Sequence, residues 1–120
     1  MLPGGADRAY AGRERPGFLR LQGYALTAVY GRARWDLRIP DCQSLKDKRR
    51  VVHGLRDRAR ARLKVSAAET SFQEDVQRAE VSIAFVSSDA TLARTILDRA
   101  DALIASDPRV YILETESEIF

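Results

Sequence analysis

The chain contains a run of basic residues whose type and spacing suit the binding of phosphate groups. Cations three or four residues apart on a helix share one face, and their heads can follow a phosphate backbone. A helix N-terminus adds free N–H groups and a partial positive charge. We therefore predict a nucleic-acid-binding surface, with a solvated face neutralised by nearby aspartates as the alternative. The candidate residues are Arg34, Arg38, Lys46, Lys48, Arg49 and Arg50.

A second candidate site is the polar stretch that contains Gln73, Gln77 and Arg78. It lies in a connection between two predicted strands, where a protruding loop can contact a partner. An ordinary hairpin loop is the alternative interpretation.

Residue counts exclude several kinds of chemistry. The chain has one Cys and one His, at Cys42 and His53, so it has no disulfide framework, no zinc finger and no Cys/His catalytic pair. A helix N-terminus beside Cys42 could lower the thiol pKa, although a bystander thiol is the simpler interpretation. The chain also lacks Asn, a phosphate-binding glycine loop and a nucleophile motif. We therefore predict a protein that is not an enzyme and has no metal or cofactor.

The net charge of +3 conceals a strong asymmetry. Residues 32–64 hold twelve Lys/Arg against four Asp, whereas residues 65–120 hold four Arg against eleven Asp/Glu. One side of such a domain attracts phosphates and the other repels them. The clustering of the cations is better evidence than the abundance of Arg, which biased codon usage can also produce.

The first part of the chain is predicted to be an extension. Residues 1–27 are rich in Gly, Pro and scattered charges and have no apolar period, so we expect a flexible segment or a start site placed too far upstream. No stretch has the ~20 apolar residues that a membrane span needs. With one Cys and no export signal, we expect the cytoplasm.

The remaining residues alternate strand and helix patterns. Apolar and charged residues alternate from Val29 to Ile39, which predicts a half-buried strand with Trp35 in the core. Ser44 is a good helix N-cap, and the apolar stripe that follows it lies next to Lys48. Lys48 therefore either pairs with a carboxylate, for which Glu69 and Glu80 are candidates, or binds a ligand. Further strands are predicted over 64–70, 79–87 and 110–118, with a second helix capped by Ser88 or Asp89 and ending at Asp107-Pro108.

The resulting order is β-α-β-β-α-β. Two amphipathic helices are both buried when they cover the same face of a four-stranded antiparallel sheet, so we predict an α+β, ferredoxin-like split β-α-β fold over residues 28–120. The other face of the sheet stays open, with Tyr30 as its one clear aromatic residue. A base-stacking platform of the RRM kind needs two or three. Glu114, Glu116 and Glu118 alternate on the last strand, and we predict that they form a solvated edge.

The segment Ile39 to Arg50, with its Ser-Leu-Lys-x-Lys-Arg core, resembles the signature of the YlxP-like bacterial proteins, a family of unknown function. The resemblance continues through 64–69, 73–79 and 86–89 and covers roughly Ala28 to Phe120. Val76 stands where the family commonly has a Trp. The resemblance implies a ferredoxin-like domain and, because members often lie in operons with ribosome-maturation and initiation factors, a link to translation.

Two functions are expected from these patterns. The first is a small cytoplasmic protein that binds RNA or a ribosomal particle through its basic side. The second is a homo-oligomeric or protein-interaction module that uses the open sheet face.

Overall fold

The computed structural model describes residues 20–21, 24–25 and 28–120. Two short strands, β1 (Arg20–Leu21) and β2 (Tyr24–Ala25), pair with each other. The rest of the extension predicted over residues 1–27 lies outside the described residues. From residue 28 onward the chain forms β3 (Val29–Arg38), α2 (Leu45–Leu63), β4 (Ser66–Ser71), β5 (Arg78–Ser87), α3 (Ala90–Ala105) and β6 (Tyr111–Ile119).

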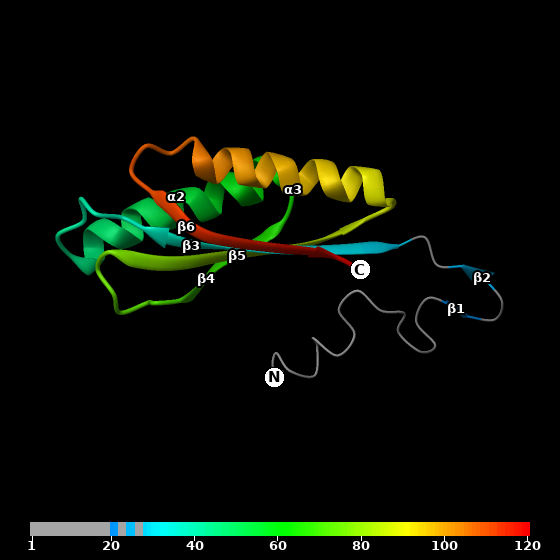
Figure 1. Ribbon diagram of the computed structural model, residues 1–120, viewed down its shortest axis with the longest axis horizontal. Coiled ribbons are helices and arrows are strands. Elements are labelled where there is room, and N and C mark those ends of the chain that lie inside the picture. The colour runs from blue at the N-terminus through cyan, green and yellow to red at the C-terminus, as the bar shows by residue number, and fades with distance from the viewer. Residues whose placement is uncertain (1–19, 22–23, 26–27) are drawn as a thin grey trace.

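The predicted order and fold are confirmed. The four longer strands form an antiparallel sheet in the order β4-β5-β3-β6, and α2 and α3 cover one of its faces (Figure 1). This is the ferredoxin-like arrangement. The other sheet face has no helix over it in the described part of the chain, so its side chains meet solvent and one another.

Core residues come from the alternation predicted for the strands. Ala33, Trp35 and Leu37 of β3 are buried between the sheet and the helices, as expected. The indole N–H of Trp35 donates to Asp101 Oδ1 of α3 at 2.9 Å, so the one polar atom of this buried ring has a partner.

Gly31 has a steric role in the sheet. It pairs with Phe85 across β3 and β5, and a Cβ built on Gly31 would overlap the Phe85 ring. The aromatic ring therefore covers the space that any larger residue at position 31 would fill.

Candidate nucleic-acid interface

Helix α2 is the element that positions most of the predicted cations. Ser44 caps it as predicted, because its side chain accepts a hydrogen bond from the backbone N–H of Asp47 at 3.1 Å. Its buried face consists of Val51, Val52, Leu55 and Ala59, together with one charged residue that is described below. The opposite face of α2 is therefore fixed toward solvent.

Three of the predicted cations project from that outward face. Lys46, Arg49 and Arg50 are exposed and form no ion pair or side-chain hydrogen bond with the residues that the structure describes. Arg62 and Lys64, near the other end of α2, are exposed and unpaired in the same sense. At 1.5 Å per residue, the cations from 46 to 64 extend over about 27 Å.

The whole segment 45–64 is strongly basic. It holds nine Lys/Arg and two Asp, which leaves a formal charge of +7. Some of that charge is used within the fold, since Arg56 contacts Asp57 and Arg58 contacts the buried Asp107. The remaining exposed cations leave unpaired positive charge on the outward face of α2.

Lys48 does not belong to that surface, and its prediction as a phosphate ligand is wrong. Its side chain is fully buried. The ammonium donates to the carbonyl oxygens of Phe72, Gln73 and Arg78 at 2.7, 3.3 and 3.2 Å, and lies 2.8 Å from Glu69 Oε2.

Three carbonyls use all three protons of the Lys48 ammonium, and Glu69 supplies the opposite charge. This explains why Glu69 Oε2 has no hydrogen bond of its own although it contacts the ammonium. The structural partner proposed for Lys48, Glu69, is confirmed. Lys48 thus ties α2 to the loop between β4 and β5.

Arg34, which was predicted to bind phosphate, is not available for that role either, because three carboxylates surround it on the open sheet face. Its guanidinium lies 3.4 Å from Glu80, 3.2 Å from Glu114 and 3.2 Å from Glu116. Burial alone would lower the pKa of Arg34, but the hydrogen bonds to Glu114 and Glu116 outweigh it and raise that pKa. Arg34 therefore remains protonated, and the neighbouring carboxylates balance its positive charge.

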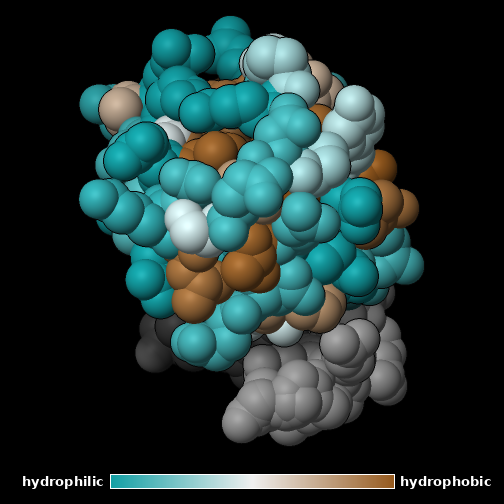
Figure 2. Space-filling model, turned by 90° about the vertical axis from the view of Figure 1, so that its left-hand side faces the viewer, coloured by the Kyte–Doolittle hydropathy of each residue, from teal (hydrophilic) through white to brown (hydrophobic). Residues whose placement is uncertain are grey.

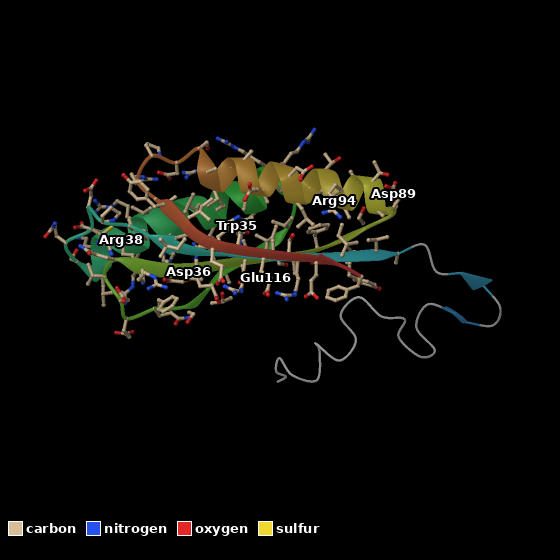
Figure 3. All side chains as sticks on the ribbon, in the orientation of Figure 1. Trp35, Asp36, Arg38, Asp89, Arg94 and Glu116 are labelled. Atoms are coloured by element: carbon tan, nitrogen blue, oxygen red, sulfur yellow. The ribbon has the colours of Figure 1, made fainter. Side chains whose placement is uncertain are left out.

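The glutamates of β6 are partners of these arginines and not only a solvated edge, which corrects the prediction made for them. Arg32 donates to Glu118 at 2.7 Å, and the hydrogen bond from Arg34 lowers the pKa of Glu116. Strand register makes this possible, since Arg32 lies opposite Glu118 and Arg34 opposite Glu116. Figure 3 shows Asp36 and Glu116 on the sheet face opposite the helices.

Arg38, the last residue of β3, differs from Arg34. It is exposed and has no ion pair within residues 28–120. It lies at the end of the sheet where β3 leads into α2 (Figure 3). Arg38 thus joins Lys46, Arg49 and Arg50 as a cation available to a ligand.

The side chains of the predicted partner-binding loop mostly hold the loop in place. The amide of Gln77 donates to the carbonyls of Pro40 and Cys42, and Arg78 makes two hydrogen bonds to Asp36 Oδ1 and one to Oδ2. Gln73 is exposed, with a longer contact of 3.4 Å to the carbonyl of Glu69. The geometry therefore favours the structural interpretation for Gln77 and Arg78.

Cys42, the lone cysteine of the chain, is buried. Burial, and next the charge of Asp47, raise the pKa of the Cys42 thiol, so the helix N-terminus does not activate it. His53 is exposed on α2. Among the described residues there is no group of three or more His, Cys, Asp and Glu side chains that could hold a metal ion. No helix in the same part of the chain is long and apolar enough to span a membrane.

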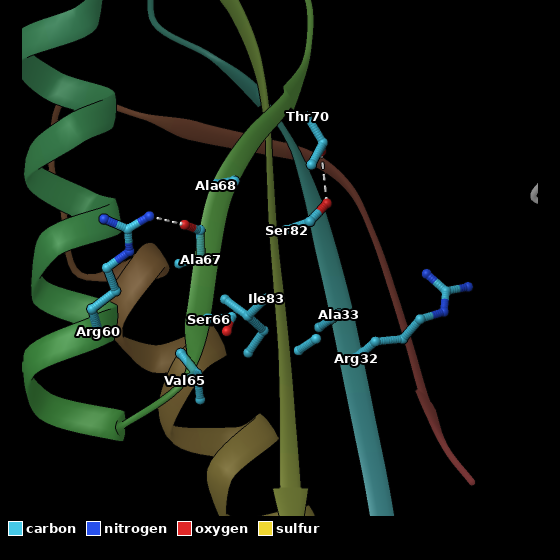
Figure 4. A pocket seen from close by; sticks show the side chains of 11 residues that line it. Arg32, Ala33, Arg60, Val65, Ser66, Ala67, Ala68, Thr70, Ser82 and Ile83 are labelled. Carbon is cyan, nitrogen blue, oxygen red and sulfur yellow. Dashed lines mark hydrogen bonds between the residues drawn. The ribbon is translucent and has the colours of Figure 1, made fainter. Parts of the chain in front are cut away.

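A shallow groove runs along the edge strand β4 (Figure 4). Small side chains such as Ala68, Ser82 and Ala84 line most of it. Its two charged residues already have partners, because Arg60 donates to the carbonyl of Ala67 at 2.7 Å and Arg32 pairs with Glu118. The groove therefore offers no free charged side chain to a ligand.

The end of the molecule at which α2 begins is mostly hydrophilic, with small separate hydrophobic patches (Figure 2). The loops that follow β3 and β4 and the loop that precedes β6 meet at this end (Figure 1). This end also holds the free cations, since β3 ends here with Arg38 and the first turns of α2 contain Lys46, Arg49 and Arg50.

Comparison with known proteins agrees with the resemblance found in the sequence. A family model described as "Protein of unknown function (DUF503)" matches residues 31–117. The chain belongs to this family. The chain is also 34% identical over 92 residues to "Uncharacterized protein YlxP" of Bacillus subtilis (strain 168), which covers 77% of this chain and all of that protein. The DUF503 match thus includes Arg38 and the exposed cations from Lys46 to Lys64.

Proposed function

We propose that this DUF503 member is a non-enzymatic cytoplasmic protein that binds the phosphate backbone of RNA, as displayed on a ribosomal particle, through the outward face of α2. One observation carries the proposal. Lys46, Arg49 and Arg50 on this face have no acidic partners among residues 28–120, whereas Arg32 and Arg34 on the sheet do.

The chemistry of the surface favours contact with phosphates over reading of bases. Lys and Arg side chains on a solvent-facing helix place positive charge along the backbone of a nucleic acid, and such contacts position a protein without reading sequence. The binding should weaken steeply as salt rises, because each neutralised phosphate releases counterions.

The competing hypothesis is a homo-oligomer formed through the open sheet face. The side of that face formed by β3 and β6 is occupied by charged pairs such as Arg34–Glu116, and covering them removes water from each charge. The side formed by β4 and β5 is less charged and includes Ala84 and the exposed Val86. The experiment below separates the two hypotheses.

The test is sedimentation of the tagged protein from a lysate through a density gradient at low and at high salt. We expect co-migration with ribosomal particles at low salt and return to the top of the gradient at high salt. The double variant Arg49→Ala/Arg50→Ala should stay at the top in both conditions. The matched control, Arg94→Ala/Arg99→Ala, removes two exposed arginines from α3 and should migrate like the wild type.

Two outcomes would contradict the proposal. One is a wild-type protein that stays at the top of the gradient even at low salt. The other is a salt-resistant dimer peak that both double variants retain, which would favour the oligomer.

A further inference from the structure

The open sheet face has an aromatic residue that simple alternation does not predict. Side chains of a regular strand alternate between the two faces of the sheet. Since Glu114 is on the open face, Tyr111, three residues earlier, would be expected to point toward the helices. A register shift between β3 and β6 changes this, because Asp36 pairs with Glu114 while Leu37 pairs with Ile112. Leu113 is thus the extra residue of a bulge, and bulges re-aim the side chains beyond them.

The bulge places Tyr111 opposite Arg38, on the open face. Ile112 pairs with the fully buried Leu37 and packs against the core, so its neighbour Tyr111 has the opposite orientation. The Tyr111 side chain is 61% exposed. It makes no hydrogen bond or ring contact with any residue of the described domain.

A second aromatic residue lies on the other side of Arg38. Arg38 pairs with Arg78 of β5, and the Arg78 guanidinium lies over the Phe72 ring, 4.5 Å from its centre. Since neighbouring strands are about 4.8 Å apart, Tyr111 and Arg78 flank Arg38 across about 10 Å. We call these four residues, Tyr111, Arg38, Arg78 and Phe72, the terminal platform.

The terminal platform lies at the end of the sheet at which α2 begins. Residues 39–44 connect Arg38 directly to the first turn of α2, where Lys46, Arg49 and Arg50 are exposed (Figure 1). An exposed ring, a stacked Arg and an unpaired cation therefore lie at the same end of the domain as the first turns of α2, on the sheet face opposite the helices. Rings and guanidinium planes stack on bases only when those bases are unpaired, because a duplex hides their faces.

We infer that the terminal platform binds unpaired nucleotides, with Tyr111 stacking on a base while Arg38 contacts a phosphate. The inference rests on the proposed function, since the outward face of α2 supplies most of the attraction. It specifies the ligand further as a single-stranded or looped segment of RNA.

The test measures fluorescence anisotropy of a labelled oligouridylate and of an RNA duplex with the same number of phosphates, both at low salt. Stacking on one aromatic side chain is worth enough that Tyr111→Ala should weaken oligouridylate binding about tenfold. Duplex binding should change less than about twofold, since contacts to phosphates remain. Tyr111→Phe keeps the ring and should bind oligouridylate like the wild type.

The matched control is Leu113→Ala, which removes another exposed apolar side chain of β6 and should not weaken binding to either RNA. Oligouridylate binding that Tyr111→Ala leaves unchanged, while Arg49→Ala/Arg50→Ala abolishes it, would overturn this inference alone. A wild-type protein that binds neither RNA would overturn both the inference and the proposed function.

Discussion

Strand β3 and helix α2 come from the same basic stretch of sequence, yet their arginines have opposite surroundings. Arg32 and Arg34 of β3 face the carboxylates of Glu116 and Glu118 on β6. Arg49 of α2 faces solvent without a partner among the described residues. The charge of a stretch of sequence therefore does not give the charge of the surface that it forms. Strand register brings glutamates from 80 or more residues away onto the arginines of β3, whereas the cations of α2 stay free.

The same contrast exists within α2, between the buried Lys48 and the exposed Lys46. Replacing Lys48 gives the largest expected change in stability. Lys48→Met leaves Glu69 charged without its partner and removes the ammonium from three carbonyls. Breaking a buried ion pair on one side costs about 3–5 kcal/mol of unfolding free energy. Urea unfolding measures this value.

The control for that experiment is Lys46→Met, which makes the same change on the exposed face of the same helix. It should alter the unfolding free energy by less than about 0.5 kcal/mol. Equal stabilities for the two variants would refute the structural role of Lys48.

Asp107 provides the next largest effect, since it pairs with Arg58 of α2 and with Arg109. The hydrogen bonds from Arg109 lower the pKa of Asp107 to about 2, against 3.8 ordinarily. Because the pKa of Asp107 is lower in the folded state, its charged carboxylate stabilises the fold at pH values above 3.8. This stabilisation is lost as the pH falls from 3.8 toward 2. Asp107→Asn should therefore destabilise the protein by about 2 kcal/mol at neutral pH.

Denaturant unfolding at a series of pH values measures the difference between wild type and Asp107→Asn. The two stability curves should converge as the pH falls toward 2. A difference that stays constant down to that pH would show that the charge of Asp107 contributes nothing.

The open sheet face should become basic once its acids are removed. Glu114→Gln, Glu116→Gln and Glu118→Gln together release Arg32 and leave Arg34 with one carboxylate partner, Glu80. These two less restrained cations should bind a polyanion, which steepens the salt dependence by about 0.7–0.9 per phosphate contact and raises affinity about tenfold at low salt. Elution from heparin resin across a salt gradient measures the gain.

A control with the same change in net charge uses carboxylates that pair with no arginine in the described domain: Asp41→Asn, Glu74→Gln and Asp98→Asn. This variant should shift elution less than the β6 variant. Equal shifts would mean that net charge alone matters and that the sheet arginines were never restrained.

The smallest effect concerns the backbone of α2 and should leave its charged surface unchanged. Gly54 lies inside the helix, where Gly is about 0.5–1 kcal/mol less favourable than Ala. A Cβ there would come within 3.3 Å of Arg58 Nη1, the end of a flexible side chain. Gly54→Ala should therefore raise the unfolding free energy by about 0.5–1 kcal/mol without changing heparin elution. Thermal unfolding measures the change in stability. A loss of stability would show that Arg58 cannot move aside.

Much of the fold was predictable because its signals are local. Period-two alternation in β3, the cap at Ser44 and the apolar stripe of α2 each follow from residues within one or two turns or strands. The place of Lys48 beside the apolar stripe left two alternatives, a carboxylate partner or a ligand, and only the assembled structure selects Glu69.

The candidate site was less predictable, because it depends on register. The ferredoxin-like order already places the last strand beside the first, yet nothing local states that Arg34 faces Glu116. The bulge at Leu113 is a second example, since one extra residue turns Tyr111 to the face that its spacing from Glu114 argues against. Charge partners and strand irregularities emerge only from the assembled sheet.

The burial of Lys48 also gives the protein a reporter of its own folding. All three lysines of the chain, Lys46, Lys48 and Lys64, lie within or next to α2, and of these only Lys48 is buried. An amine-reactive reagent should therefore acylate the other two in the native protein and reach Lys48 only when α2 separates from the β4–β5 loop. The rate of labelling at that one position would measure how often the domain opens.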